Sequence, residues 1–256
     1  MTTKGYILLF LAGIHDLLEN APTPSDTYRA VYGYAPYKPK NLYPVISRML
    51  SDKQIEKTER NGVACFRITN RGLKDVEEII PLERLRLKWD GYWRMVIFDI
   101  EEKWKKDRDR IRSVLKDLGF AMLQESSWIT PFPIENELIS HLSKIRVSGE
   151  VLVTKTKILS GDIRAIVNRV WKLDELDDNY RELTEEVEDR KVNTYSQAAR
   201  WELRFLDLLA EDPLLPVQLL PRRWYGAAAK QVYNTKIRVI LNRPADKRDK
   251  RLSKDC

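Results

Sequence analysis

Apolar residues recur at helical spacing in three stretches near the start of the chain, and an alternating pattern follows them. The spacing predicts helices over residues 5–18, 25–32 and 41–51. The next segment, IEKTERNGVACFRIT, alternates apolar and polar residues on both sides of Asn61-Gly62, the strongest short-range signal for a β-hairpin. Three helices followed by a hairpin are the layout of a winged helix-turn-helix domain, which we place at residues 1–80.

The third helix of such a domain enters the major groove of DNA, and the hairpin touches the phosphate backbone. The predicted third helix buries one apolar stripe and leaves polar residues outside. Its candidates for contacts with DNA are Lys40, Asn41, Tyr43, Ser47 and Arg48. The hairpin and the residues that flank it offer phosphate contacts from Lys57, Arg60, Arg67 and Arg71. Winged helices also serve as protein-interaction modules, so DNA binding by this unit is a hypothesis.

A different pattern occupies the middle of the chain. Aromatic and β-branched residues predict a strand over 92–100 that is buried on both faces, and an amphipathic helix follows it over 103–118. The remaining elements expected there are a strand pair over 120–130, a helix over 133–145 and a strand over 150–158. The order strand, helix, two strands, helix, strand is the ferredoxin-like βαββαβ arrangement, which we place at residues 81–159.

The last third of the chain reads as helices. We expect a helical domain at 160–241 and a basic, disordered tail at 242–256. Trp171, Trp201 and Trp224 fit either a helical core or the wall of a pocket for an acyl group. Together the three units predict an α+β multidomain protein.

Composition narrows the classes of function. The net charge is +7, and residues 236–256 hold 8 basic residues against 3 acidic ones, so an anionic partner such as duplex DNA is expected. Two cysteines and two histidines, all far apart, exclude a disulfide framework and a zinc cluster. No apolar run approaches the roughly 20 residues of a membrane span, and no signal peptide is indicated, so we expect a cytoplasmic protein without a membrane partner.

Four segments, in this order, resemble landmarks of the PaaX family of bacterial transcriptional repressors. They are WDGYWRMVIFDIEEKW, LGFAMLQESSWITP, LSGDIRAIVNRVWKLDEL and DPLLPVQLLPRRW. The resemblance covers nearly the whole chain. It implies an N-terminal winged helix, a middle domain similar to the small ferredoxin-fold nuclease of CRISPR adaptation, and a helical C-terminal domain. Glu101 departs from the proline that the family usually has after FDI, and the end of the chain is short and unusually basic.

The same resemblance implies a homodimeric repressor that binds an operator duplex and is released by a small effector. In the members that gave the family its name the effector is phenylacetyl-coenzyme A, so an acyl-coenzyme A compound is a candidate partner class. No cofactor is expected for such a regulator. A rival from another class is an architectural DNA-binding protein that takes no small ligand.

Asp99 raises a second alternative, a metal-dependent nuclease. In the nuclease that the middle domain resembles, the aspartate that ends the first strand coordinates Mg²⁺ across a dimer axis. Asp99 would be both the catalytic and the metal-binding residue, and Mg²⁺ the cofactor. Glu101 and Glu102 have an ordinary explanation, because the dipole at the start of a helix stabilises carboxylates. The sequence therefore favours a regulator without enzymatic activity, with the nuclease as the alternative.

Overall fold

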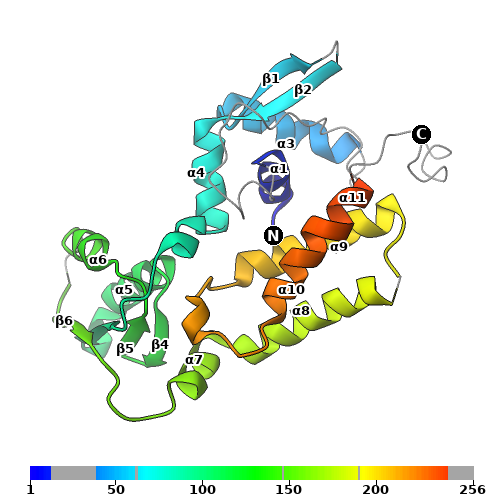
Figure 1. Ribbon diagram of the computed structural model, residues 1–256. Helices are drawn as coiled ribbons and strands as arrows, with labels where there is room; N and C mark the ends of the chain where they lie inside the picture. The colour runs from blue at the N-terminus through cyan, green and yellow to red at the C-terminus, as the bar shows by residue number, and fades with distance from the viewer. Residues whose placement is uncertain (13–38, 61–62, 146, 190, 242–256) are drawn as a thin grey trace. The chain divides into compact units, whose positions relative to one another are not determined.

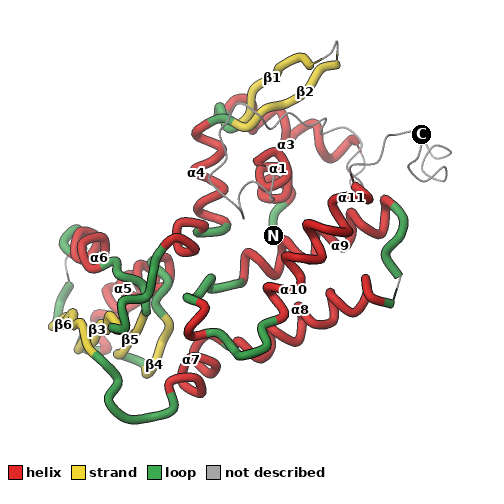
Figure 2. The backbone as a smooth tube through the Cα atoms, in the orientation of Figure 1, coloured by secondary structure: helices red, strands yellow, loops and turns green. Residues whose placement is uncertain are grey.

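The structure is a computed structural model that describes residues 1–12, 39–60, 63–145, 147–189 and 191–241. It is a mixed α and β fold with two antiparallel sheets, which are drawn in yellow in Figure 2. Two compact units divide the described residues. The first draws on Met1–Leu82, Leu176–Asp212 and Arg223–Cys256, and the second on Glu83–Glu175 and Pro213–Arg222. The second helix expected from the sequence and the C-terminal tail lie outside the described residues.

The N-terminal part of the first unit contains three helices and a strand pair. Their bounds are α1 Thr3–Ala12, α3 Pro39–Ser51, β1 Ile55–Arg60, β2 Val63–Ile68 and α4 Asn70–Ile79. Helix α1 packs against α3, β2 and α4, and its apolar residues are buried among them. Strands β1 and β2 are antiparallel, with Arg60 opposite Val63 across the predicted turn. The turn residues themselves lie outside the described part of the chain.

Two details of this part differ from the sequence expectation. Helix α3 begins at Pro39, two residues before the expected cap Asn41, so Pro44 lies inside the helix and removes one backbone hydrogen bond there. Helix α4 was not predicted. Thr69 caps it by accepting a hydrogen bond from the backbone N–H of Gly72 at 3.2 Å. Gly72 is required at that position, because a Cβ would stand 2.3 Å from the carbonyl oxygen of Gln54.

The C-terminal helices, apart from the first three residues of α8, complete the first unit. Their bounds are α8 Leu173–Glu188, α9 Tyr195–Glu211, α10 Tyr225–Val232, the π-helical turn η4 Tyr233–Ile237 and α11 Arg238–Leu241. Helix α9 contacts η4 and α11 (Figure 1). Between them Trp201, Phe205 and Tyr233 stack, with ring centroids 5.3–6.4 Å apart. Trp201 therefore belongs to a helical core.

The second unit is built on a four-stranded sheet. Its main elements are β3 Trp93–Asp99, α5 Lys105–Asp117, β4 Ala121–Gln124, β5 Ser127–Thr130, α6 Glu135–Leu142 and β6 Glu150–Thr156. The strands lie in the order β4-β5-β3-β6, and all neighbouring pairs are antiparallel. The unit also contains the 3-10 turns η1 Leu82–Arg86, η2 Glu102–Trp104 and η3 Val217–Leu219, and helix α7 Ile163–Trp171.

Helices α5 and α6 cover one face of this sheet (Figure 1). Alternate residues of β3, Val96 and Phe98, point into that core and meet Ile111 and Leu115 of α5 and Leu138 of α6. Burial of such side chains is the main stabilising term of the unit, at about 25 cal/mol for each Å² of apolar surface removed from water.

The expectation that the first strand is buried on both faces is wrong for its second half. On the face away from α5 and α6, Trp93 is buried under α7, where it stacks on Trp171 with ring centroids 6.2 Å apart. Further along the strand Ile97 and Asp99 are exposed, and so is Leu152 of the neighbouring β6. The reason is that helix α7 covers this face only at the beginning of β3, where Trp171 meets Trp93.

No helix in the described ranges combines the length and the apolar character needed to cross a bilayer.

Candidate functional sites

The first candidate surface lies on α3. Ile46 and Met49 are buried against the rest of the N-terminal part, whereas Ser47 and Arg48 are exposed. A helix with one apolar stripe turned inward presents the intervening residues to solvent. The helix therefore offers a hydroxyl and a guanidinium to an external partner. The side chains of Lys40, Asn41 and Tyr43, which the sequence also nominated, lie outside the described part of the structure.

The strand pair and α4 supply the remaining basic candidates. Lys57 on β1 and Arg71 in the first turn of α4 are exposed. Arg67 on β2 is half-buried and forms an ion pair with Glu56, its cross-strand partner in β1. That ion pair neutralises part of its charge, which would weaken the phosphate contact expected of Arg67. The side chain of Arg60 is not among those described.

Asp99 ends β3 and faces Glu150 directly across the pair of strands β3 and β6. Both residues are exposed, so the two carboxylates stand at the open end of the sheet. Gly149 permits the approach, since it has φ +154° and a Cβ there would lie 2.3 Å from the carbonyl oxygen of Asp99. Within the described ranges, no group of three or more His, Cys, Asp or Glu residues is arranged to hold a metal ion.

A buried charge cluster lies at the other end of β3, and the sequence reasoning missed it. The guanidinium of Arg94 is only 1% exposed. It donates to both carboxylate oxygens of Asp90, at 2.7 and 2.8 Å, and to Oε1 of Glu135 at 2.6 and 2.9 Å. Lys155 adds a second cation, 2.9 Å from Asp90. The signal that could have revealed the cluster is the lone arginine in the apolar run WRMVIF, because a buried charge needs partners.

The charges of this cluster hold one another ionised. Hydrogen bonds from Arg94 lower the pKa of the Asp90 carboxyl well below its usual range. Partial burial opposes ionisation of Glu135, but the hydrogen bond from Arg94, a backbone hydrogen bond and the charges of Arg94 and Lys155 together outweigh it, so the pKa of that carboxyl is lowered as well. Burial likewise opposes the charge on Arg94, but the hydrogen bonds with Asp90 and Glu135 and the negative charges of these two residues together outweigh it, so the pKa of Arg94 is raised. The cluster is thus a structural clamp whose members stay charged at neutral pH.

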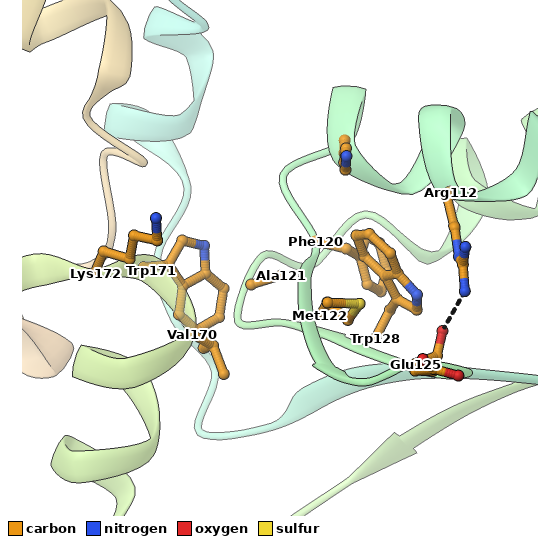
Figure 3. A pocket seen from close by; sticks show the side chains of 10 residues that line it. Arg112, Phe120, Ala121, Met122, Glu125, Trp128, Val170, Trp171 and Lys172 are labelled. Carbon is orange, nitrogen blue, oxygen red and sulfur yellow. Dashed lines mark hydrogen bonds between the residues drawn. The ribbon is translucent and has the colours of Figure 1, made fainter. Parts of the chain in front are cut away.

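A pocket of about 570 Å³ opens between the edge strand β4, the end of α5 and the end of α7. Figure 3 shows Val170 and Trp171 on one side of it and Ala121, Met122 and Trp128 on the other. Three cationic side chains, those of Arg112, Lys116 and Lys172, line the same space together with Phe120 and Glu125. The volume is in the range of small-molecule sites, which span about 300–1,000 Å³.

Two donors at this pocket have no acceptor in the described structure. The indole Nε1 of Trp128 is buried and makes no hydrogen bond in the described structure, and the same holds for Nε of Arg112. In Figure 3 the nitrogen edge of the Trp128 ring faces Arg112 and Glu125. A buried N–H without a partner typically costs about 1–3 kcal/mol, so each such group calls for an acceptor, which a water, an ion or a bound molecule can supply.

The three tryptophans named from the sequence lie in different surroundings. Trp201 is core, Trp224 packs edge-on against Tyr180 at 5.7 Å, and Trp171 lines the pocket. Trp128 is the pocket tryptophan that the sequence did not single out. Its place in an apolar strand gave no hint that a cavity lies beside it.

Comparisons with known proteins agree with this architecture. The family model described as the PaaX protein central Cas2-like domain matches residues 86–166, and the model described as the PaaX-like protein C-terminal domain matches residues 171–248. Among solved structures, the uncharacterized protein Rv0674 from Mycobacterium tuberculosis is similar, with a TM-score of 0.61 and 17% sequence identity over 93% of this chain and 95% of that one. At that identity the likeness concerns the fold. No curated protein matches the chain.

Proposed function

Because this chain belongs to the PaaX family, whose members are generally transcriptional regulators, we propose that it is a repressor that binds an operator duplex as a homodimer. The observation that carries the proposal is the exposed surface of α3, which presents Ser47 and Arg48 opposite a buried apolar stripe. A helix of this kind, followed by a strand pair with an exposed lysine, is suited to insertion into the major groove.

We propose a separate role for each of the three parts of the chain. Residues 1–80 act as a winged helix-turn-helix, with α3 as the reading helix and β1 and β2 as the wing. Residues 81–159 act as a ferredoxin-like domain, an assignment that the antiparallel order β4-β5-β3-β6 supports. Residues 160–241 form a helical domain that supports dimerisation, and the basic residues of 242–256 add attraction for DNA. A small effector releases the complex, and the site of action is the cytoplasm.

The test is duplex binding by the full chain. DNA selected from a random pool against the wild-type protein serves as the probe, and the dissociation constant is measured between 50 and 300 mM salt. The double variant Lys40→Ala/Arg48→Ala should weaken binding about 10-fold or more. It should also reduce the slope of log K against log [salt] by about one for each phosphate ligand that the substitutions remove.

Arg200→Ala is the matched control, because Arg200 is an exposed arginine of α9, remote in sequence from the proposed reading helix. It should bind DNA as the wild type does. Wild-type affinity in the Lys40/Arg48 variant, together with an unchanged salt slope, would contradict the proposed role of α3.

A second function has one observation in its favour. Asp99 and Glu150 stand side by side and exposed, and paired carboxylate oxygens are the ligands that Mg²⁺ prefers. If the protein is a nuclease, duplex DNA should be cut only when Mg²⁺ is added, and Asp99→Ala should abolish the cutting. Intact DNA at equal protein concentration, with and without Mg²⁺, would leave the regulator as the proposed function.

A further inference from the structure

We propose that the outer face of helix α5 is a further DNA-binding surface, which holds the phosphate backbone of a duplex without reading its sequence. The proposal deepens the proposed function and rests on it for the kind of nucleic acid. It does not depend on how the two units are arranged, because all residues of this surface belong to the second unit. The proposed reading helix α3 and the wing belong to the first unit.

Helix α5 holds most of the excess positive charge of the second unit. It contains six basic residues and three acidic ones, whereas the rest of residues 83–175 contains 12 basic and 12 acidic residues. The helix lies on one face of the sheet (Figure 1), and it packs there through Ile111 and Leu115. The side chains on its opposite side, the outer face, therefore carry this excess charge into solvent.

Four cations of the outer face make no contact that would neutralise them. Lys105, Lys106, Arg110 and Lys116 are exposed, and within the described ranges no hydrogen bond or ion pair holds their side chains. Lys106 and Lys116 are separated by about 15 Å along the helix axis, a length over which one strand of DNA carries about four phosphates. Such side chains can replace the counterions of a phosphate backbone without first breaking an internal ion pair.

The placement of these cations is unfavourable for the helix itself. Lys105 and Lys106 lie in the first turn of α5, where the helix dipole disfavours positive charge. Lys106 and Arg110 are four positions apart, so two like charges are neighbours on the helix surface. Acidic residues in the first turn would stabilise the helix better. The arrangement therefore indicates an external anion that compensates the repulsion.

The other residues of the outer face favour duplex DNA over other partners. Asp109, Ser113 and Asp117 lie among the cations, and no apolar residue of α5 is exposed. A protein interface needs an apolar or aromatic centre, and binding in a membrane surface needs an apolar face. Single strands are held by several aromatic side chains that stack on bases, and within residues 101–117 the exposed aromatic residue is Trp104 alone. Duplex phosphates require only suitably spaced cations.

The test compares two duplexes of 40 base pairs in binding to the full chain. One has a random sequence, and the other contains a sequence selected against the wild-type protein. Lys106→Ala/Arg110→Ala should weaken binding to both about fivefold, and the slope of log K against log [salt] should fall by about two. The ratio of the two affinities should stay unchanged, because phosphate contacts carry no sequence information. In the reading-helix variant Lys40→Ala/Arg48→Ala this ratio should fall.

Two further variants show that the position of the charge matters. Arg164→Ala/Arg169→Ala is the matched control, because it removes two exposed arginines from α7, which packs on the other face of the sheet. It changes the net charge equally and should leave both affinities unchanged. Asp109→Asn removes a negative charge from the outer face of α5 and should tighten binding to both duplexes about twofold. Equal losses in the α5 and α7 double variants would overturn the proposal.

Trp104 reports on this surface directly. It is 45% exposed, it directly precedes Lys105, and Nζ of Lys103 lies 5.9 Å from the centre of its ring. Its indole N–H signal in a nitrogen-15 NMR spectrum is identified with Trp104→Phe. The signal should shift when the random duplex is added, both in the wild type and in the reading-helix variant. A signal that stays in place in both proteins would also overturn the proposal.

The outcomes separate this proposal from the proposed function. Wild-type DNA affinity in Lys106→Ala/Arg110→Ala, together with a loss in the reading-helix variant, would remove the α5 surface and keep the regulator. A loss in the α5 variant, together with an unchanged affinity ratio in the reading-helix variant, would keep the α5 surface and remove the role of α3. A changed sedimentation coefficient of the α5 variant at unchanged DNA affinity would assign the face to a second copy of the chain and overturn the proposal.

Discussion

Arg94 and Glu135 are joined by a contact of 2.6 Å between Nη2 and Oε1, although 41 positions separate them in the sequence. The contact ties β3 to the first turn of α6, and Asp90 and Lys155 complete the cluster around it. Arg94 is almost fully buried, whereas the side chains of Asp90 and Glu135 are each 34% exposed. Loss of the two carboxylates should therefore destabilise the protein more than loss of Arg94, because water can solvate the carboxylates but not the buried guanidinium.

That inequality predicts the effect of breaking the cluster from either side. Asp90→Asn/Glu135→Gln leaves a buried guanidinium without a countercharge and should lower the free energy of unfolding by about 3–5 kcal/mol. Arg94→Met leaves two partly solvated carboxylates beside Lys155 and should cost less, about 1–2 kcal/mol. Urea unfolding followed by tryptophan fluorescence measures both. A larger loss in Arg94→Met than in the double variant would show that the arginine is not the desolvated partner.

The same cluster predicts how stability depends on pH. Hydrogen bonds from Arg94 hold the pKa of Asp90 below its ordinary value of 3.8, and the pKa of Glu135 lies below its ordinary 4.5 despite partial burial. Folding therefore favours the ionised carboxyls, and this stabilisation is complete above those ordinary values and lost as the pH falls below them. The melting temperature of the wild type should fall more steeply from pH 6 to pH 3 than that of Arg94→Met. Parallel curves would rule out a contribution from the cluster.

Gly149 provides a test of the close approach at the end of β3. Gly149→Ala places a Cβ 2.3 Å from the carbonyl oxygen of Asp99 and keeps a positive φ, so it should cost about 2–4 kcal/mol. Gly91→Ala is the matched control, because Gly91 has φ +81° and nothing lies within 4 Å of its added Cβ. That substitution should cost only about 1–2 kcal/mol of backbone strain. Thermal unfolding of both variants checks the difference, and equal losses would mean that the carbonyl moves aside freely.

Tyr6 links α1 to α9 within the first unit. Its hydroxyl donates to the carboxylate of Asp207, with both oxygens at 2.6 Å. A hydrogen bond to a charged acceptor contributes about 1.5–3 kcal/mol, so Tyr6→Phe should speed hydrogen exchange of the α1 amides roughly 10-fold or more relative to those of α8. Tyr225→Phe, a change of a half-buried tyrosine elsewhere in the unit, should leave α1 exchange unchanged. Unchanged exchange in Tyr6→Phe would show that packing alone holds α1.

Local signals account for the elements that the sequence predicted. Asn61-Gly62 between two alternating segments indicated a hairpin, and the described strands β1 and β2 pair on either side of it. Helix α4 had a local signal that was overlooked, since Thr69 caps it and the buried Gly72 and Val76 lie four positions apart on one face. Propensity, capping and periodicity act within about one turn, which is why a single sequence can reveal them.

Long-range neighbours account for what the sequence could not reveal. The apolar pattern of β3 indicated burial. Which half of its second face is covered depends on the position of α7, and α7 begins only at Ile163, 64 positions after Asp99. Glu135 and Lys155, which complete the charge cluster around Arg94 and Asp90, come from two distant segments, and the pocket walls come from α5, the β4 and β5 strand pair and α7. Glu150 became the neighbour of Asp99 only through the register of β6 on β3.

The amino-acid sequence by itself determined much of the order of helices and strands, though not α4, together with the basic ends of the chain and the resemblance to a family of regulators. The tertiary structure alone decided that Arg94 is clamped, that Ile97 and Leu152 are exposed, and that Trp128 and Trp171 share a pocket. The physical reason is that periodicity and capping depend on residues a few positions apart, whereas burial, ion pairing and cavities depend on side chains that folding brings together from distant segments.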